Sequence, residues 1–366
     1  MAADIHRAPA RPRAEGRRAF ATALALGPLL ATLSTPAVHA QQLPAGLAGL
    51  APAERSARLV EGARREVGLN LYTSLTQEDM AALNGAFERR YGVKVKMWRA
   101  SGDKVLQRVL AEQRAGRFEV DVVEANALTL ESLQREHGLQ PVNSPLQGEL
   151  IAGAVPAHRG WVASRLNVFV QAYHTGKVPA ATVPHRYEDL LDPRWKGRIG
   201  AEASDDDWFS VVVQKMGEAR GLQFFRELVR TNGVSVRRGH TLLTSLVASG
   251  EVPYALTVYN FTAEQLRLKG APIAWHVLEP AVARANGLAL PQRVPNPHAA
   301  LLYYDFMIGD EGQRILIERG FVPTQRKAPS PLGATALTVV DAARLLDDGD
   351  KWARLYEDII VKQNRN

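Results

Sequence analysis

The stretch from Asn296 to Met307 reads NPHAALLYYDFM and says more about the fold than any other part of the chain. Asn296 can cap a helix, and Pro297 suits the first helical turn because its missing N–H would be unpaired there anyway. Apolar side chains then recur mainly at helical spacing, which predicts a helix with one mostly apolar face. The residues that set this spacing are Leu301, Leu302, Asp305 and Phe306.

A second helix is predicted immediately after the first. Gly309 interrupts the apolar run, and the sequence continues as DEGQ at 310–313. Asp310 followed three residues later by Gln313 resembles a capping box, in which two side chains satisfy unpaired N–H groups at a helix start. Local chemistry therefore predicts two successive helices.

Strand and helix patterns alternate over most of the chain and predict an α/β sheet. Short apolar runs predict strands at 69–73, 93–98, 120–123, 199–203, 234–236, 254–259 and 273–277, with a longer strand or strand pair at 161–174. Periodic segments predict helices at 54–66, 77–90, 103–115, 128–137, 208–216, 222–230, 242–249, 262–269, 339–346 and 352–361.

The N-terminus has the layout of a secretory signal peptide, so residues 1–40 are expected to be removed. A basic region with five arginines precedes the uncharged apolar run Phe20–Leu33, and Val38-His39-Ala40 fits a small-residue cleavage site. Arg17-Arg18 also resembles a twin-arginine signal, which leaves the export route open between the general and the twin-arginine pathways.

Composition limits the class of protein further. The chain has no cysteine, which excludes disulfides, thiolate metal sites and a cysteine-linked lipid anchor. We therefore expect a soluble periplasmic protein that is not lipid-anchored. The net charge is +7, of which residues 1–40 carry +3, and no basic stripe interleaved with aromatic residues suggests nucleic acid. No segment of about 20 apolar residues follows residue 40, so no spanning helix is expected.

Five segments in matching order resemble the bacterial extracellular solute-binding proteins of ABC importers, of the type that binds ferric ion or phosphonate. The resemblance covers roughly residues 67–325 and rests on the stretch quoted above together with Val67–Ser74, Phe87–Val95, Asp189–Ile199 and Ala248–Val252. It implies a two-lobed periplasmic-binding-protein fold (type II-like), in which each lobe is a mixed sheet flanked by helices and a hinge joins the lobes.

The resemblance also implies a function and lobe boundaries. The first lobe would comprise 67–167 plus 282–325, and the second 168–281 plus 326–366. The lobes would close over a small solute, such as an anion, a ferric ion, a metal–anion complex or a phosphonate-like compound. The closed form would dock on the membrane permease. We expect a monomer without a cofactor.

Three loops of the first lobe are candidate ligand contacts, because ligands of open α/β sheets bind at the carboxyl ends of strands near helix N-termini. Thr73 and Ser74 follow the first strand, and the nearby Thr76 could instead cap the next helix. Ser101 and Gly102 follow the second strand, a position that the resembled family uses for ligand contact. Glu124 follows the third strand and is expected to face either a cation or solvent.

Three loops of the second lobe are the corresponding candidates. Ser204 and Asp205 begin the run SDDDW, in which one or two of the aspartates are also expected to cap a helix. His240 and Thr241 stand at another helix start, although a lone histidine is often structural. Tyr259 ends a strand, near where the resembled family places ligand-contacting tyrosines.

The metal ligands, if any, stay open from the sequence, with Tyr259 as one possible ligand. Ferric-ion receptors of the resembled family present two adjacent tyrosines, but Tyr259 is followed by Asn260. The pair Tyr303-Tyr304 lies within the predicted helix, where packing and surface roles are expected. A direct ferric site built from a tyrosine pair is therefore not predicted.

Two other functions compete with a transport receptor. A secreted hydrolase or metal-dependent enzyme could use the aspartates at 205–207 with His240, but the Gly-x-Ser-x-Gly, His-Glu-x-x-His and P-loop motifs are absent. A periplasmic sensor for a signalling partner would share the same fold and site. We expect a binding protein and no enzyme.

Overall fold

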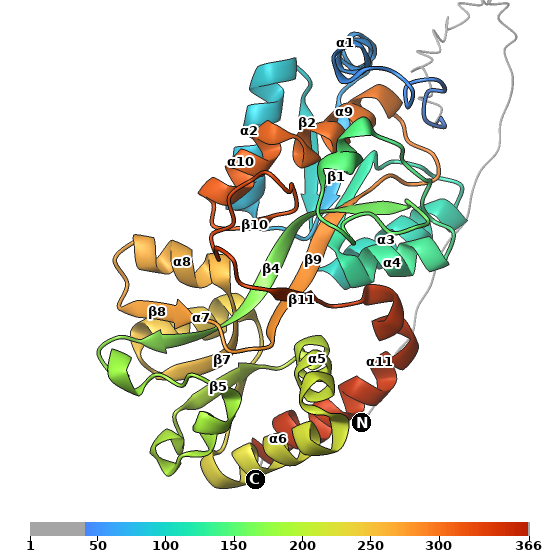
Figure 1. The fold of residues 1–366 in the computed structure, drawn as a ribbon. Helices are drawn as coiled ribbons and strands as arrows, with labels where there is room; N and C mark the ends of the chain where they lie inside the picture. The colour runs from blue at the N-terminus through green and yellow to red at the C-terminus, as the bar shows by residue number, and fades with distance from the viewer. Residues whose placement is uncertain (1–40, 365–366) are drawn as a thin grey trace, which may run out of the picture. The chain divides into compact units, whose positions relative to one another are not determined.

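The computed structural model describes residues 41–364, so the predicted signal peptide at 1–40 lies outside the described residues. The described residues belong to one compact unit. Its centre is a mixed α/β sheet with helices on both sides (Figure 1), which confirms the predicted fold class.

The main path of the sheet has the order β2-β1-β3-β9-β4-β7-β5-β6. The bounds along that path are Val95–Arg99 for β2, Leu69–Thr73 for β1, Val122–Asn126 for β3, Ala281–Ala289 for β9, Trp161–His174 for β4, Tyr254–Tyr259 for β7, Ile199–Glu202 for β5 and Ser235–Arg237 for β6. Three further strands pair with the central ones: β8 (Ile273–His276), β10 (Val322–Pro323) and β11 (Leu337–Val339).

The long strands β4 and β9 join the two halves of the sheet (Figure 1). The stretch Trp161–Val168 of β4 pairs antiparallel with β9, whereas Phe169–His174 pairs antiparallel with β7 and β8. Both strands are almost wholly buried, so they act as a shared core element rather than as an exposed linker.

Eleven α-helices are found among the described residues. The first six along the chain are α1 (Pro52–Ala63), α2 (Gln77–Tyr91), α3 (Gly102–Arg114), α4 (Ala127–Arg135), α5 (Asp206–Met216) and α6 (Glu218–Asn232). The others are α7 (His240–Ser249), α8 (Asn260–Leu268), α9 (Pro297–Ile308), α10 (Asp310–Glu318) and α11 (Ala342–Tyr356). Short helical turns occupy Pro145–Glu149, Ala180–Thr182, Tyr187–Leu191, Pro193–Trp195, Glu357–Val361 and Lys362–Asn364.

The α9 helix differs from the predicted amphipathic helix because it is buried on nearly all sides. Its outer side is covered by α1, whose Arg55 donates to Asp305 at 2.7 Å. Asn296 occupies the cap position but makes no side-chain cap bond; its Nδ2 donates to Asp121 instead. The α9 start is satisfied by Glu66, which accepts from the backbone N–H groups of His298 and Ala299.

The predicted capping box at the start of α10 is also wrong. Gly309 is the cap residue, and Gln313 turns inward, where its Nε2 donates to the Ser164 and Met307 carbonyls. Its Oε1 accepts from the Thr324 N–H. Gln313 therefore ties α10 to the central strand β4.

The ends of most predicted helices and strands agree with the structure to within two or three residues. Two differences are informative. The third strand extends to Asn126, because 123–126 pair with β9, so Glu124 lies inside a strand rather than in a loop. The predicted C-terminal helices at 339–346 and 352–361 are replaced by the strand β11, the single helix α11 and a following π-helical turn.

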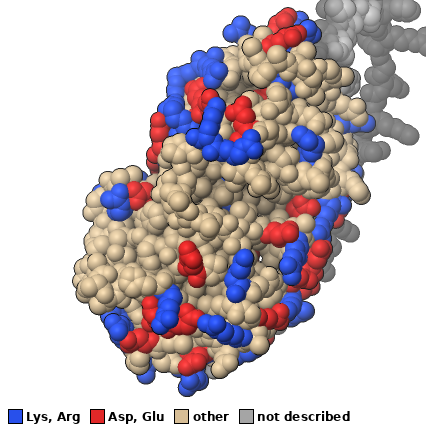
Figure 2. Space-filling model, in the orientation of Figure 1, with Lys and Arg blue, Asp and Glu red and all other residues tan. Residues whose placement is uncertain are grey.

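On the face drawn in Figure 2, acidic and basic side chains lie next to one another, so the positive net charge is not gathered there into one basic patch. Many of these exposed charges form ion pairs, such as Arg58 with Glu54. Within residues 41–364, no helix combines the length and the apolar character needed to cross a membrane.

The contact between α1 and α9 gives a first prediction. Arg55 is 2% and Asp305 13% exposed, so replacing Arg55 with alanine leaves a mostly buried carboxylate unpaired. We expect Arg55→Ala to lower the free energy of unfolding by about 3 kcal/mol, measured by urea denaturation. Arg58→Ala is the matched control, because Arg58 and Glu54 are 62% and 51% exposed and such pairs contribute less than about 1 kcal/mol. If Arg55→Ala and Arg58→Ala lowered the free energy of unfolding equally, the claim that Arg55 compensates a buried charge on α9 would be wrong.

A second prediction concerns His276 on β8. Burial, and secondly the neighbouring His185, lower the pKa of His276 to about 4, below its usual value of 6.5. Between pH 6.5 and 4 the unfolded chain therefore binds the extra proton, and stability falls as the pH is lowered through this window. We expect His276→Gln to remove a slope of up to about 1.4 kcal/mol per pH unit from urea unfolding curves. If the free energy of unfolding of wild type and of His276→Gln depended on pH in the same way, His276 would not be the source of this pH dependence.

Candidate functional site

A continuous row of polar side chains crosses the middle of the sheet on one face. Strand register places Thr73 opposite Glu124, and Asn126 opposite Asn286. The row continues where β9 meets β4 and where β4 meets β7. Side chains two residues apart on a strand share a face. We call this row the polar stripe; it consists of Thr73, Glu124, Asn126, Asn286, Arg284, Arg165, Asn167 and Tyr259.

One end of the stripe is neutralised by a buried ion pair. Arg165 Nη1 lies 2.7 Å from Glu124 Oε1. The other Glu124 oxygen accepts from the Thr73 hydroxyl at 2.5 Å and from the Leu75 N–H at 3.2 Å. The predicted contacts Thr73 and Glu124 are thus fully buried and engaged with each other and with Arg165.

The other end of the stripe is organised around Arg284. Its guanidinium makes two bonds of 2.6 Å to the Asp207 carboxylate and donates to the Tyr259 hydroxyl at 2.6 Å. It also lies 5.1 Å from the Phe169 ring. Burial opposes the charge of Arg284, but the facing Asp207 carboxylate raises the pKa of Arg284 well above its usual value. Burial also raises the pKa of Tyr259, so its hydroxyl stays protonated at neutral pH.

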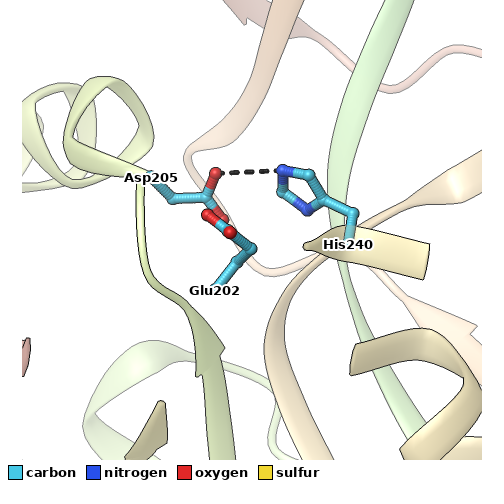
Figure 3. Close-up of side chains that lie close together, drawn as sticks. All are labelled: Glu202, Asp205 and His240. Carbon is cyan, nitrogen blue, oxygen red and sulfur yellow. Dashed lines mark ion pairs between the residues drawn. The ribbon is translucent and has the colours of Figure 1, made fainter. Parts of the chain in front are cut away.

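Three further groups meet as Figure 3 shows: Glu202 at the end of β5, Asp205 just before α5, and His240 at the first position of α7. Each offers one ligand atom, and these atoms lie within 4.8 Å of one another. His240 Nε2 is 3.2 Å from Asp205 Oδ1. The His240 ring packs on Tyr259 with a centroid distance of 3.9 Å. The structure therefore brings together three predicted contacts, Asp205, His240 and Tyr259.

Backbone contacts hold Glu202 in place. Its two carboxylate oxygens accept from the Ser204 N–H at 2.5 Å and the Gly239 N–H at 2.7 Å. Its own carbonyl accepts from the hydroxyl of Tyr356, which lies at the end of α11. The C-terminal helix thus supports this corner of the site.

Several buried polar atoms around the stripe have no hydrogen-bond partner. Both carboxylate oxygens of Asp205, which is 0% exposed, fall in this class, although one lies at ion-pair distance from His240. The others here are His240 Nδ1, Asn167 Oδ1 and Arg165 Nε. Buried polar groups are nearly always paired, so the gathering of these atoms around the stripe makes it a candidate place for a bound molecule.

The aspartates at 205–207 do not cap α5 as predicted. Asp205 holds the cap position without a side-chain cap bond, and Asp207 accepts from the Trp208 N–H of the first turn at 2.7 Å while it also binds Arg284. Burial first, and then the neighbouring Asp207 charge, raise the pKa of Asp206 to about 6. Negative charge is therefore concentrated on this side of the stripe.

The remaining predicted contacts lie at loop positions around the stripe. Ser74 is half-buried beside Glu124, whose carbonyl accepts from the Ser74 N–H at 3.0 Å. Ser101 is exposed and makes no side-chain cap bond to α3. A Cβ on Gly102 would come within 2.6 Å of Thr129 Oγ1, so α3 starts tightly against α4.

The other predicted residues lie at helix starts or inside a helix. Ser204 and Thr241 are exposed at the starts of α5 and α7. Thr76 does cap α2, where it accepts from the Asp79 N–H. Tyr303 and Tyr304 are completely buried in α9, where they contact Asn84 and Gln147, so the packing role is confirmed and the surface role is wrong.

Sequence reasoning missed the interior of the stripe. Arg165 and Asn167 stand two residues apart in the segment Trp161–Val170, whose other residues except Ser164 are apolar, and Arg284 and Asn286 repeat the pattern in β9. Polar residues at period two in a buried strand are a usable signal for a shared polar face. Glu202 was also missed, and nothing in its local sequence distinguishes it from an ordinary strand end.

Comparisons with known proteins agree with this architecture. The major ferric iron-binding protein of Neisseria meningitidis serogroup B is 25% identical over 261 residues, which cover 68% of this chain and 78% of that protein. The structure of iron-bound HitA from Pseudomonas aeruginosa superposes with a TM-score of 0.69 at 20% identity, covering 80% of this chain and 99% of HitA.

A third similar protein was solved with a different type of ligand. The periplasmic binding protein AfuA from Actinobacillus pleuropneumoniae, with exogenous fructose-6-phosphate bound, gives a TM-score of 0.68 at 20% identity and covers 80% of this chain and 98% of AfuA. These neighbours show that the fold is the two-lobed periplasmic-binding-protein fold.

Residues 126–344, more than half of the chain, match the family described as bacterial extracellular solute-binding protein. The match confirms the resemblance to solute-binding proteins of ABC importers that the sequence motifs indicated. The chain therefore belongs to the family of bacterial extracellular solute-binding proteins.

Proposed function

We propose that this protein captures a small solute against the polar stripe and delivers it, in the periplasm, to the permease of an ABC importer. The observation that carries the proposal is the set of unpartnered buried atoms on Arg165, Asn167, Asp205 and His240. A solute bound there would supply the hydrogen-bond or ionic partners that buried polar groups require. The family membership supports the same conclusion.

The proposed contacts come from both lobes. Ser74, Ser101 and Gly102 would contact the solute from the first lobe, and Ser204, Asp205, His240 and Thr241 from the second. Thr73, Glu124 and Tyr259 would form the inner layer that holds the stripe in place, because each already bonds Arg165, Arg284 or a neighbour. Helix starts at Gly102 and His240 add N–H groups that suit an anionic part of the solute.

The charges of the stripe favour a cation or a metal–anion complex over a bare anion. Arg165 is neutralised by Glu124, and Arg284 by Asp207. Glu202 and Asp205 have no arginine or lysine of their own, so the site keeps excess negative charge. The names of relatives that bind ferric iron are in line with a metal-containing solute.

We also propose the lobe boundaries and a hinge at the long strands. The first lobe would hold 67–167 with 282–325, and the second 168–281 with 326–366. The change of pairing partners of β4 between Val168 and Phe169 supports a boundary at this point. Residues on both sides of the boundary contact α11, since Arg135 binds Asp347 and Phe209 packs against Trp352.

We further propose that the protein acts as a monomer and performs no reaction. Asp207 and Tyr259 are both held by Arg284, so neither side chain is available as a base. A hydrolase using Asp206 or His240 would show turnover that disappears in Asp206→Asn or His240→Ala. The proposal expects no turnover in the wild-type protein with ester or phosphoester substrates.

Solute binding is tested most simply by thermal stability. A ligand that binds only the folded protein stabilises it by about 2.7 kcal/mol at 100 times Kd. We expect ferric citrate or another metal complex to raise the unfolding temperature, and inorganic phosphate or fructose 6-phosphate alone to have a smaller effect. The absence of stabilisation by every metal complex, anion, phosphonate and amine in the screen would contradict the proposed function.

The position of the solute is tested by a pair of asparagine variants. Asn167 has an unpartnered buried oxygen, so Asn167→Ala should keep the stability of the free protein but weaken solute binding. Asn84 is the matched control, because its oxygen accepts from Tyr303 at 2.7 Å. Asn84→Ala should cost about 1–3 kcal/mol of stability and leave the affinity unchanged. The opposite pattern in calorimetry and urea unfolding would place the solute elsewhere.

A further inference from the structure

Glu202, Asp205 and His240 form an unusual group within the proposed solute site (Figure 3). They come from β5, the start of α5 and the start of α7, so the fold rather than local sequence brings them together. Glu202 and Asp205 are buried, and His240 is partly buried. Two carboxylates placed this close together repel each other unless a cation lies between them.

Asp205 shows that the group is incomplete. Its carboxylate is 0% exposed and neither oxygen accepts a hydrogen bond, so its closest partner is His240 Nε2, 3.2 Å from Oδ1, within the group itself. The nearest arginine, Arg284, is 3.7 Å away and is already held by Asp207 and Tyr259. Removing an ionised carboxylate from water is costly, so buried charges are paired or coordinate metals. His240 Nδ1 is likewise buried without a partner.

The distances suit one small ion. Ligand atoms bound to a common metal at about 2.0–2.3 Å lie at most about 4.6 Å apart. The three atoms here lie within 4.8 Å of one another, so small side-chain rotations bring all three to a shared ion. Acceptors at about 2.8 Å around the nitrogen of an organic ammonium group lie about 4.6 Å apart, so the distances also admit such a group and the types of ligand decide between the two.

The ligand types narrow the class of ion. Carboxylate with imidazole suits zinc, iron and manganese, whereas calcium and magnesium prefer sites made of oxygen alone. Two carboxylates and a neutral imidazole carry a total charge of −2, which balances a divalent ion. Tyr259 is not available as a phenolate ligand, because its hydroxyl is bound to Arg284.

The surrounding contacts orient the three groups. The Ser204 and Gly239 N–H groups each donate to one oxygen of Glu202, which leaves a lone pair on each oxygen for an ion. Tyr259 packs against the His240 ring and fixes its plane. Such outer contacts are typical of metal sites, where they hold the ligands in position before the ion arrives.

We propose that Glu202, Asp205 and His240 bind a divalent transition-metal cation, as the metal-binding part of the solute site. This inference rests on the proposed function and specifies the chemical class of its solute. The cation is cargo, bound alone or as part of a complex whose anion contacts the nearby helix starts.

The test uses the full chain after removal of metals with EDTA and dialysis. Isothermal titration with zinc or manganese chloride should show one site in the wild-type protein, with weaker or no binding of calcium and magnesium. Asp205→Asn and His240→Gln should each weaken zinc or manganese binding by at least about 100-fold, because outer contacts alone already contribute 10–100-fold. Asp350→Asn, an exposed carboxylate on α11, is the matched control and should bind like wild type.

A stability measurement separates a ligand role from a structural role. Because Asp205 is buried without hydrogen bonds, Asp205→Asn should leave the metal-free protein at least as stable as wild type. The inference is overturned if no transition metal binds, if calcium binds equally well, or if Asp205→Asn binds zinc with wild-type affinity. If the thermal screen finds a solute whose affinity is unaffected by EDTA and by Asp205→Asn, the metal inference fails while the proposed function stands.

Discussion

Two arginines on the central strands, Arg165 buried and Arg284 partly buried, impose the constraint on which the rest of the structure depends. Arg165 on β4 and Arg284 on β9 lie in the middle of the sheet, where a guanidinium without a counter-charge would be very costly. Glu124 neutralises the first, and Asp207 the second. Because one acid comes from β3 and the other from the start of α5, each pair fixes a different part of the proposed solute site to the shared strands.

This arrangement explains why one side of the proposed site is negatively charged and the other side is polar without excess charge. After the two ion pairs are made, Glu202 and Asp205 remain on one side with excess negative charge. The other side presents hydroxyls and helix N–H groups near Ser101 and Gly102. A solute with a positive centre and a negative or polar periphery fits both sides, whereas a simple anion would meet uncompensated carboxylates. The two ion pairs thus determine which charges remain to contact a solute.

Local periodicity predicted most of the strands and helices, but it missed β9, one of the two long central strands. It also placed Asp205, His240 and Tyr259 correctly at strand ends and helix starts, and the structure brings these three together. It failed where distant segments decide the outcome. Glu124 lies in a strand because of pairing with β9, and α9 is buried all round because α1 covers it. The pairing of Arg284 with Asp207, 77 positions apart, has no local signature.

The central claim is that the solute binds at the polar stripe beside Asp205 and His240. The most direct measurement is a crystal structure of the protein with the solute that co-purifies with it, combined with anomalous scattering to locate any metal. The account predicts solute density in contact with Asp205 and His240 and between the two lobes. Density at another place, such as the cavity of about 240 Å³ beside Arg55 and Asp305, with the stripe unaltered, would contradict it.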